Sequence, residues 1–162
     1  MNRPHWIVPL ALIWITSLFL HLAWEMWQVP FYEGMASASH AAAIWVCTKA
    51  TFGDANIAVT AYLTAALSVR SIHWVSTPAS KPLFFYLLAG LLITILFEYM
   101  ATEILGRWQY NEQMPTLPLL GTGLLPLAQW VVVPVVSLYA SRLMYFGMRP
   151  MRNNAPSGQQ SL

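Results

Sequence analysis

Long apolar runs separated by short polar stretches dominate this chain. Four runs, at about 6–28, 54–74, 82–105 and 124–146, are long enough to cross a membrane. A hydrocarbon core about 30 Å thick needs roughly 20 helical residues. The pattern therefore predicts an all-α, polytopic membrane protein with four transmembrane helices.

The connections between these runs differ in character. Residues 37–46 have the pattern of a short helix that is too short to cross, so we expect it to be interfacial or re-entrant. The connection at 107–123 is rich in proline, glycine and aromatic residues. From residue 151 the chain is polar, which favours disorder. We therefore predict a transmembrane domain over 1–150 and a disordered tail over 151–162.

Composition excludes several classes of protein. Only 9% of the residues are charged and 57% are hydrophobic, whereas soluble domains carry roughly 25% charged residues. The single cysteine, Cys47, excludes an intramolecular disulfide framework. The net charge of +2 is too small to indicate nucleic-acid binding. We expect a membrane lipid as partner, with a homodimer or a larger membrane complex left open.

The distribution of cations predicts the orientation. Four spans put both termini and the second connection on one side. That side carries six of the eight Lys and Arg residues, namely Arg3, Arg70, Lys81, Arg142, Arg149 and Arg152. The other side carries Lys49 and Arg107. By the positive-inside rule we expect both termini in the cytoplasm of a bacterial-type inner membrane.

This topology places most of the strongly polar side chains in one layer near the outer ends of the spans. The residues concerned are His21, Glu25, Asp54, Glu98, Gln129 and Trp130. The inner halves of the spans look nearly free of such groups. Because a carboxylate within a membrane is costly, it indicates a functional site.

His21, Glu25 and Glu98 are the candidate catalytic residues. His21 and Glu25 are four residues apart, so they share a helical face, and Gln28 continues that face. Glu98 lies in an apolar turn and needs a partner. A hydrogen-bonded core histidine and helix-packing carboxylates are the alternative. For Asp54, a helix cap is the alternative to a place in the wall of the site.

A loop beside this layer, 106–115, contains Trp108 and Tyr110, which we expect to line or cover a pocket. Belt residues at the membrane interface are the alternative. Histidine with carboxylates suits proton transfer or a metal ion. The sequence lacks HxxxH, HExxH and CxxC patterns, so we expect proton transfer, with no metal and no cofactor.

Several short motifs resemble the emopamil-binding-protein family, the sterol isomerases with the EXPERA domain. They are HLAWE at 21–25, PFYE at 30–33, GD at 53–54 and AQW with VP at 128–134. The resemblance implies a proton shuttle at a double bond by His21 and Glu25. It also implies that Gln129 and Trp130 stabilise a carbocation.

The leading hypothesis is therefore an acid–base pocket acting on an isoprenoid, sterol-like or quinone-type lipid that enters sideways from the bilayer. If it is an enzyme, it is an isomerase. His21, Glu25 and Glu98 would be catalytic, and the substrate would be bound by Asp54, Trp108, Tyr110, Gln129 and Trp130. The first alternative is a non-enzymatic accessory subunit or lipid-binding module. The second is a proton-coupled carrier, against which the apolar inner halves count.

Overall fold

The computed structural model describes residues 5–118 and 121–148. Four helices account for most of this part of the chain: α1 (Ile7–Gln28), α2 (His40–Val69), α3 (Ser80–Tyr99) and α4 (Leu124–Gly147). Short 3-10 turns follow α1 at Val29–Phe31 and precede α3 at Trp74–Ser76, and a π-helical turn extends α3 over Met100–Ile104. The described residues form no β-strand longer than an isolated bridge.

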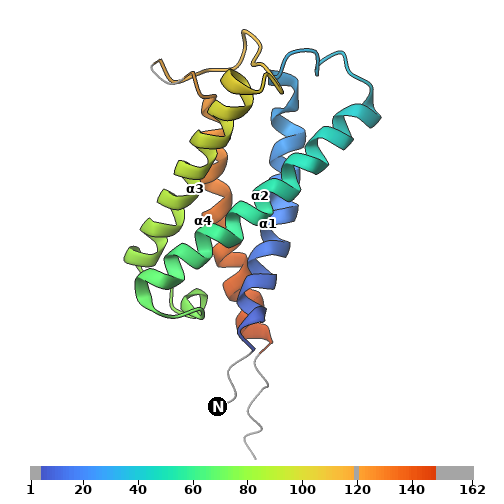
Figure 1. Ribbon diagram of the computed structural model, residues 1–162. Helices are drawn as coiled ribbons and strands as arrows, with labels where there is room; N and C mark the ends of the chain where they lie inside the picture. Colours follow the sequence, from blue (N-terminus) through green and yellow to red (C-terminus); the bar gives the residue numbers. More distant parts are fainter. Residues whose placement is uncertain (1–4, 119–120, 149–162) are drawn as a thin grey trace, which may run out of the picture.

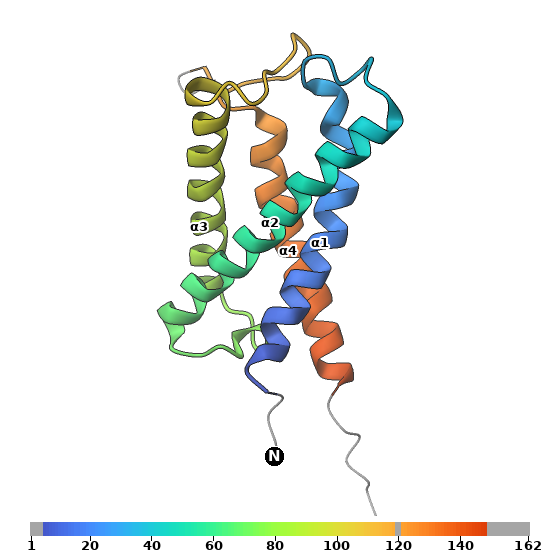
Figure 2. The ribbon, with the colours of Figure 1, turned by 45° about the vertical axis from the view of Figure 1, so that its right-hand side comes forward.

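The helices form one bundle with two distinct ends (Figure 1). We call the end at which α1 begins and α4 ends the terminal end, and the opposite end, with connections 29–39 and 105–123, the loop end. α1 packs against α2 and α4, and α3 also packs against α2 and α4. α2 runs obliquely across the bundle from the loop end to the terminal end (Figures 1 and 2).

Three helical segments of the described chain are long and apolar enough to cross a membrane: Ile7–Phe31, Ser80–Ile104 and Leu124–Gly147. They correspond to the first, third and fourth predicted spans. The all-helical class is confirmed, and three such helices are consistent with a membrane protein. Phe19, Leu92 and Leu143 are more than half exposed on these helices. Such apolar surface suits contact with lipid. The predicted polar tail at 151–162 lies outside the described residues.

The structure corrects the start of the second predicted span and the separate short helix. One continuous 30-residue helix, α2, covers both regions. No proline occurs between Pro30 and Pro78 to break it, and Gly53 is simply helical. The N-cap is Ser39, whose hydroxyl accepts a hydrogen bond from the backbone N–H of Ala42 at 3.2 Å. Asp54 therefore lies inside a helix and caps none.

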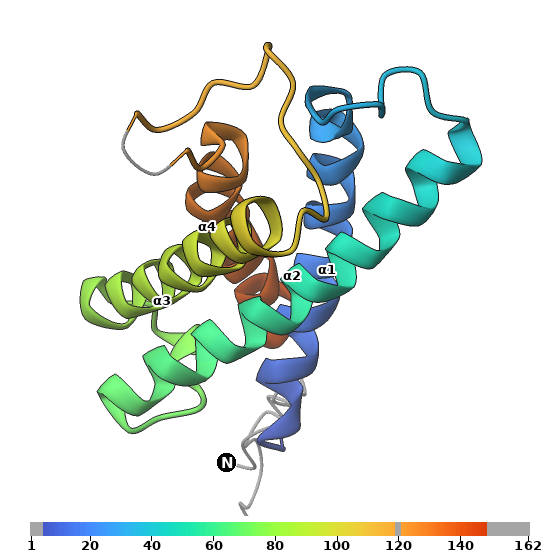
Figure 3. The ribbon, with the colours of Figure 1, turned by 45° about the horizontal axis from the view of Figure 1, so that its top comes forward.

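The two connections lie at the same end of the bundle (Figure 3). They are hydrogen-bonded to each other. The backbone N–H of Glu33 donates to the carbonyl of Gln109 at 2.9 Å, and that of Asn111 donates to Phe31 at 3.0 Å. The Asn111 side chain donates to the carbonyl of Pro30 at 2.8 Å. These bonds hold the loop after α3 across the end of α1.

A close approach of α3 and α4 positions the central tryptophan. The indole of Trp130 packs directly on Gly90, where a Cβ atom would overlap the ring. Nearer the terminal end, Tyr62 stacks on Trp74 with ring centroids 4.8 Å apart, and Tyr86 meets both rings edge-on. The core nearer the terminal end thus contains a cluster of three packed aromatic rings.

Candidate functional site

One face of α1 carries the polar residues of the site. His21, Glu25 and Gln28 are buried, with relative exposures of 0%, 8% and 2%. Their spacing of four and three residues keeps them on this face. The Gln28 side-chain N–H donates to the Glu25 carboxylate at 2.7 Å. The predicted shared face of His21, Glu25 and Gln28 is therefore buried inside the bundle.

Gln129 of α4 lies at the centre of the site. Its amide nitrogen is 2.7 Å from His21 Nδ1, 3.1 Å from Glu25 Oε1 and 3.3 Å from Asp54 Oδ2. Its carbonyl oxygen accepts a weaker bond from Gln28 at 3.4 Å. Three helices, α1, α2 and α4, therefore converge on one buried amide.

The numbers of hydrogen-bond donors and acceptors in the site indicate that one of its two carboxyl groups is protonated. An amide NH₂ group donates two hydrogen bonds, but three groups surround that of Gln129. His21 Nδ1 also lies 3.5 Å from Asp54 Oδ2. The carboxyl groups of Glu25 and Asp54 contact each other as well, and two carboxyls share a hydrogen bond only when one is protonated. One proton on Glu25 or Asp54 satisfies this geometry.

The histidine ring has two different environments. The imidazole packs against Trp130 in a tilted arrangement, with ring centroids 5.2 Å apart. Nδ1 faces Gln129 and Asp54, whereas Nε2 is buried and has no hydrogen-bond partner among the described residues. Trp130 is itself held against Gly90, so α3 fixes the ring that orients His21.

Glu98 belongs to a neighbouring group. Its carboxylate accepts a hydrogen bond from the Tyr110 hydroxyl and another from Trp108 Nε1, the latter at 3.3 Å. No hydrogen bond joins Glu98 to His21 or Glu25 within the described residues, although its charge acts on Glu25 and Asp54. Glu98 thus ties the loop to the end of α3, beside the buried site.

The tyrosine in this group stays neutral. Burial raises the pKa of Tyr110 well above its usual value, and the Glu98 charge raises it further. A neutral phenol can donate its proton to the carboxylate, as the contact requires. The Tyr110 ring also packs against that of Tyr32 in a tilted arrangement, with ring centroids 5.5 Å apart. The loop is therefore fastened by side chains as well as by backbone bonds.

The predicted site residues thus fall into two adjoining clusters. The first, which we call the amide cluster, consists of His21, Glu25, Gln28, Asp54 and Gln129, with Trp130 beside it. The second, the loop cluster, consists of Glu98, Trp108 and Tyr110. The remaining acids, Glu33, Glu103 and Glu112, are exposed.

Two features were not predicted from the sequence. The first is the pairing of Asp54 with Glu25, because it depends on the oblique path of α2. The second is the contact of Trp24 with the cluster: its indole N–H donates to Gln28 at 3.1 Å. The spacing of Trp24 and Gln28, one helical turn, was the available signal. Within residues 5–118 and 121–148, no group of three His, Cys, Asp or Glu side chains is arranged to hold a metal ion.

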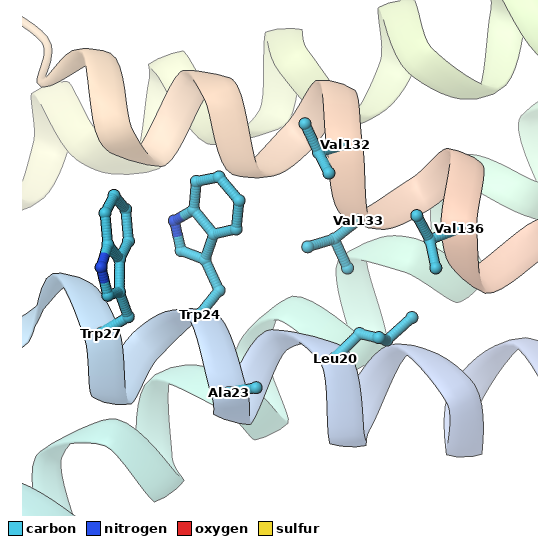
Figure 4. A pocket seen from close by; sticks show the side chains of 7 residues that line it. All are labelled: Leu20, Ala23, Trp24, Trp27, Val132, Val133 and Val136. Atoms are coloured by element: carbon cyan, nitrogen blue, oxygen red, sulfur yellow. The ribbon is translucent and has the colours of Figure 1, made fainter.

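An apolar groove lies between α1 and α4, and the Trp24 side chain forms part of its wall (Figure 4). It has a volume of about 370 Å³ and is lined by Leu20, Ala23, Trp24, Trp27, Val132, Val133 and Val136. Trp24 is in contact with both the groove and, through Gln28, the amide cluster. The groove therefore adjoins the site on the bundle's outer surface.

No protein-family model, curated protein or solved structure matches this chain.

Proposed function

We propose that this membrane protein performs acid–base chemistry on an apolar lipid of isoprenoid or sterol-like type, moving a carbon–carbon double bond. The observation that carries the proposal is the buried Gln129 amide, which contacts His21, Glu25 and Asp54 together. Packing alone rarely places an imidazole and two carboxyls around one amide in a membrane, since each charge is costly there.

The proposed reaction conserves protons. The Glu25–Asp54 pair donates its proton to one alkene carbon, which leaves a cation on the neighbouring carbon. His21 or the freed carboxylate then removes a proton from the next carbon, and the double bond forms in its new place. Proton transfer by a positioned group contributes about 10²–10⁴-fold in rate. The Trp130 ring, beside His21, suits stabilisation of the cation by its π face.

The groove supports an apolar substrate. Its walls are aliphatic and aromatic, and its volume of about 370 Å³ falls in the usual range for ligand pockets. A chain lying there would be separated from the amide cluster by Trp24 and Gln28. Rotation of the Trp24 indole would allow a double bond of a lipid in the groove to reach Glu25. Glu98, expected from the sequence to be the second acid–base group, takes no part in these two steps, and its bonds to the loop suit closure of the site.

The proposed membrane arrangement has four crossings, with α2 as an oblique, less apolar second span. At about 1.5 Å per residue, its 30 residues reach about 45 Å, enough for a tilted crossing. Both termini are then cytoplasmic, since α1 begins and α4 ends at the same end (Figure 1) and that side carries more cations.

Lipid identification in D₂O tests the proposed function. The purified protein is extracted for co-purifying lipids, which are then incubated with it in D₂O. We expect one isoprenoid or sterol-like class to be enriched, and to gain deuterium next to a shifted double bond. Recovery of bulk phospholipid only, with no deuterium gained by a panel of isoprenoid and sterol alkenes, would contradict the proposal.

That negative result would favour the accessory-subunit alternative. The same hydrogen bonds join α1, α2 and α4, so they also hold the bundle together. Interhelical hydrogen bonds in membranes average only about 0.6 kcal/mol. Neutral amides and hydroxyls would supply that stabilisation without buried carboxyls, which is why we rank this function second.

A further inference from the structure

The inner half of the bundle is not free of polar groups, contrary to the pattern expected from the sequence. The buried face of α1 that carries His21 continues toward the terminal end as Ser17 and Thr16. The buried face of α4 that carries Gln129 continues at spacings of four as Ser137, Ser141 and Tyr145. A line of buried hydroxyls therefore connects the amide cluster with the terminal end.

We define the hydroxyl track as five residues from three helices: Thr16, Ser17, Tyr86, Ser137 and Ser141. All are at most 8% exposed. The Thr16 and Ser141 hydroxyls are 2.8 Å apart. The Thr16 hydroxyl donates to the carbonyl of Leu12 at 2.8 Å and lies 3.3 Å from the carbonyl of Ser137. The Tyr86 hydroxyl lies beside the hydroxyls of Ser17 and Ser137.

The track has defined ends. At the terminal end, the Tyr145 hydroxyl follows one turn after Ser141 and lies 3.1 Å from His73 Nδ1, and His73 is partly exposed. At the other end, His21 lies one helical turn beyond Ser17. Its Nδ1 faces the amide cluster and its Nε2 is buried without a partner in the described chain. An imidazole can accept a proton on one nitrogen and release one from the other.

Unsatisfied groups along the track indicate bound water. Ser17 Oγ, Tyr86 OH and His21 Nε2 are buried and make no hydrogen bond to the described residues. Leaving such groups unsatisfied is costly in an apolar interior, and buried water commonly satisfies them. Neighbouring hydroxyls that are close but not bonded, such as Tyr86 and Ser17, suit bridging by one water molecule.

We propose that the hydroxyl track is hydrated and delivers protons from the terminal end of the bundle to His21. Each transfer breaks one O–H bond and forms another, so the track is unchanged after a proton has passed. This inference does not depend on which lipid the amide cluster binds, or on isomerase activity. A proton-coupled function requires a polar path through the bundle, and the hydroxyl track provides one between His21 and the terminal end.

Silver-ion access to introduced thiols tests the track. Ag⁺ is small, reacts with thiols in the folded protein, and blocks their labelling by a maleimide that is added after the protein has been unfolded. Ser17→Cys and Ser137→Cys are prepared in sealed vesicles of each orientation. The wild-type chain measures the constant signal of Cys47, the one native thiol, which is fully buried on α2 and out of reach of Ag⁺ in the folded protein. Ile15→Cys, on the exposed surface of α1, is the lipid-facing control.

We expect Ag⁺ applied at the terminal-end side to block Ser17→Cys and Ser137→Cys, and to leave Ile15→Cys and wild type labelled. Adding Tyr86→Phe should slow the blocking of Ser17→Cys by about two- to tenfold, the factor for one lost hydrogen bond. Phe84→Leu, on the exposed side of α3, should leave it unchanged.

Two results would overturn the proposal. In the first, Ser17→Cys and Ser137→Cys remain labelled after Ag⁺ treatment from the terminal-end side, which makes the hydroxyls packing groups only. In the second, Ile15→Cys is blocked as fast as Ser17→Cys, which shows that Ag⁺ reaches thiols on the helix surface as readily as thiols on the track. Neither result bears on deuterium incorporation into lipid, so the proposed function is tested separately.

Discussion

The residues of the site divide into those that sequence spacing predicts and those that depend on helix packing. The buried face shared by His21 and Glu25 follows from their separation of four residues, and burial bears it out. The contact of Asp54 with Gln129, at 3.3 Å, has no such local signal. It arises from the oblique crossing of α2, which brings residues 75 positions apart together.

Gly90 offers a residue-scale prediction about how His21 is oriented. A Cβ atom there overlaps the Trp130 ring, and Trp130 supports the imidazole. We expect Gly90→Ala to destabilise the protein by about 1–3 kcal/mol, the usual cost of overpacking. Thermal unfolding in detergent measures it. Gly147→Ala, where a Cβ meets nothing within 4 Å, is the control, and equal stability of the two variants would refute the close packing.

At the scale of elements, hydropathy predicts three helices well and the second poorly. The ends of α1 and α4 lie within a residue of the predicted spans, because long apolar runs end sharply at polar loops. α2 begins well before the predicted second span. Its first turns contain polar and small residues that hydropathy assigns to a connection. Helix propensity and the absence of proline prolong it instead.

Continuity of α2 predicts the effects of two glycine substitutions. Gly53 is helical and open to a Cβ, whereas Gly34 has a φ of +72°. Gly53→Ala should therefore stabilise the protein by about 0.5–1 kcal/mol, because alanine loses less backbone entropy in a helix. Gly34→Ala should destabilise it, since alanine is strained at positive φ. Chemical denaturation in detergent compares them. A loss of stability in Gly53→Ala would favour a break between an interfacial helix and a separate span.

The loop cluster predicts that the loop end becomes less stable at alkaline pH, where Tyr110 loses its proton. The pKa of Tyr110 is raised in the folded protein, by burial and then by Glu98. Its contribution to stability is therefore complete below about pH 10, the pKa of an unfolded tyrosine, and is lost as the pH rises further. Tyr110→Phe should remove this contribution and speed amide hydrogen exchange across 107–118. Exchange that matches wild type would show that Tyr110 does not fasten the loop.

For the whole molecule, the proposed topology predicts where reporters will lie. A fusion after Gln113 should report the outer side and one at the C-terminus the cytoplasm, because four crossings and the positive-inside rule place them so. Paired fluorescent and periplasm-active reporters measure this. A cytoplasmic signal from the Gln113 fusion would contradict the four-crossing arrangement and make α2 a helix that stays at one surface.

The central claim is that Glu25, within the amide cluster, transfers a proton to the lipid. The most direct measurement is the rate at which the bound lipid gains deuterium from D₂O in the Glu25→Gln variant. Glutamine keeps the size and hydrogen bonding of the side chain but cannot donate an acidic proton. We expect the rate to fall about 10²–10⁴-fold, while Glu103→Gln, at an exposed acid, retains the wild-type rate. Wild-type deuterium incorporation by Glu25→Gln would contradict the catalytic assignment and leave the cluster a packing role.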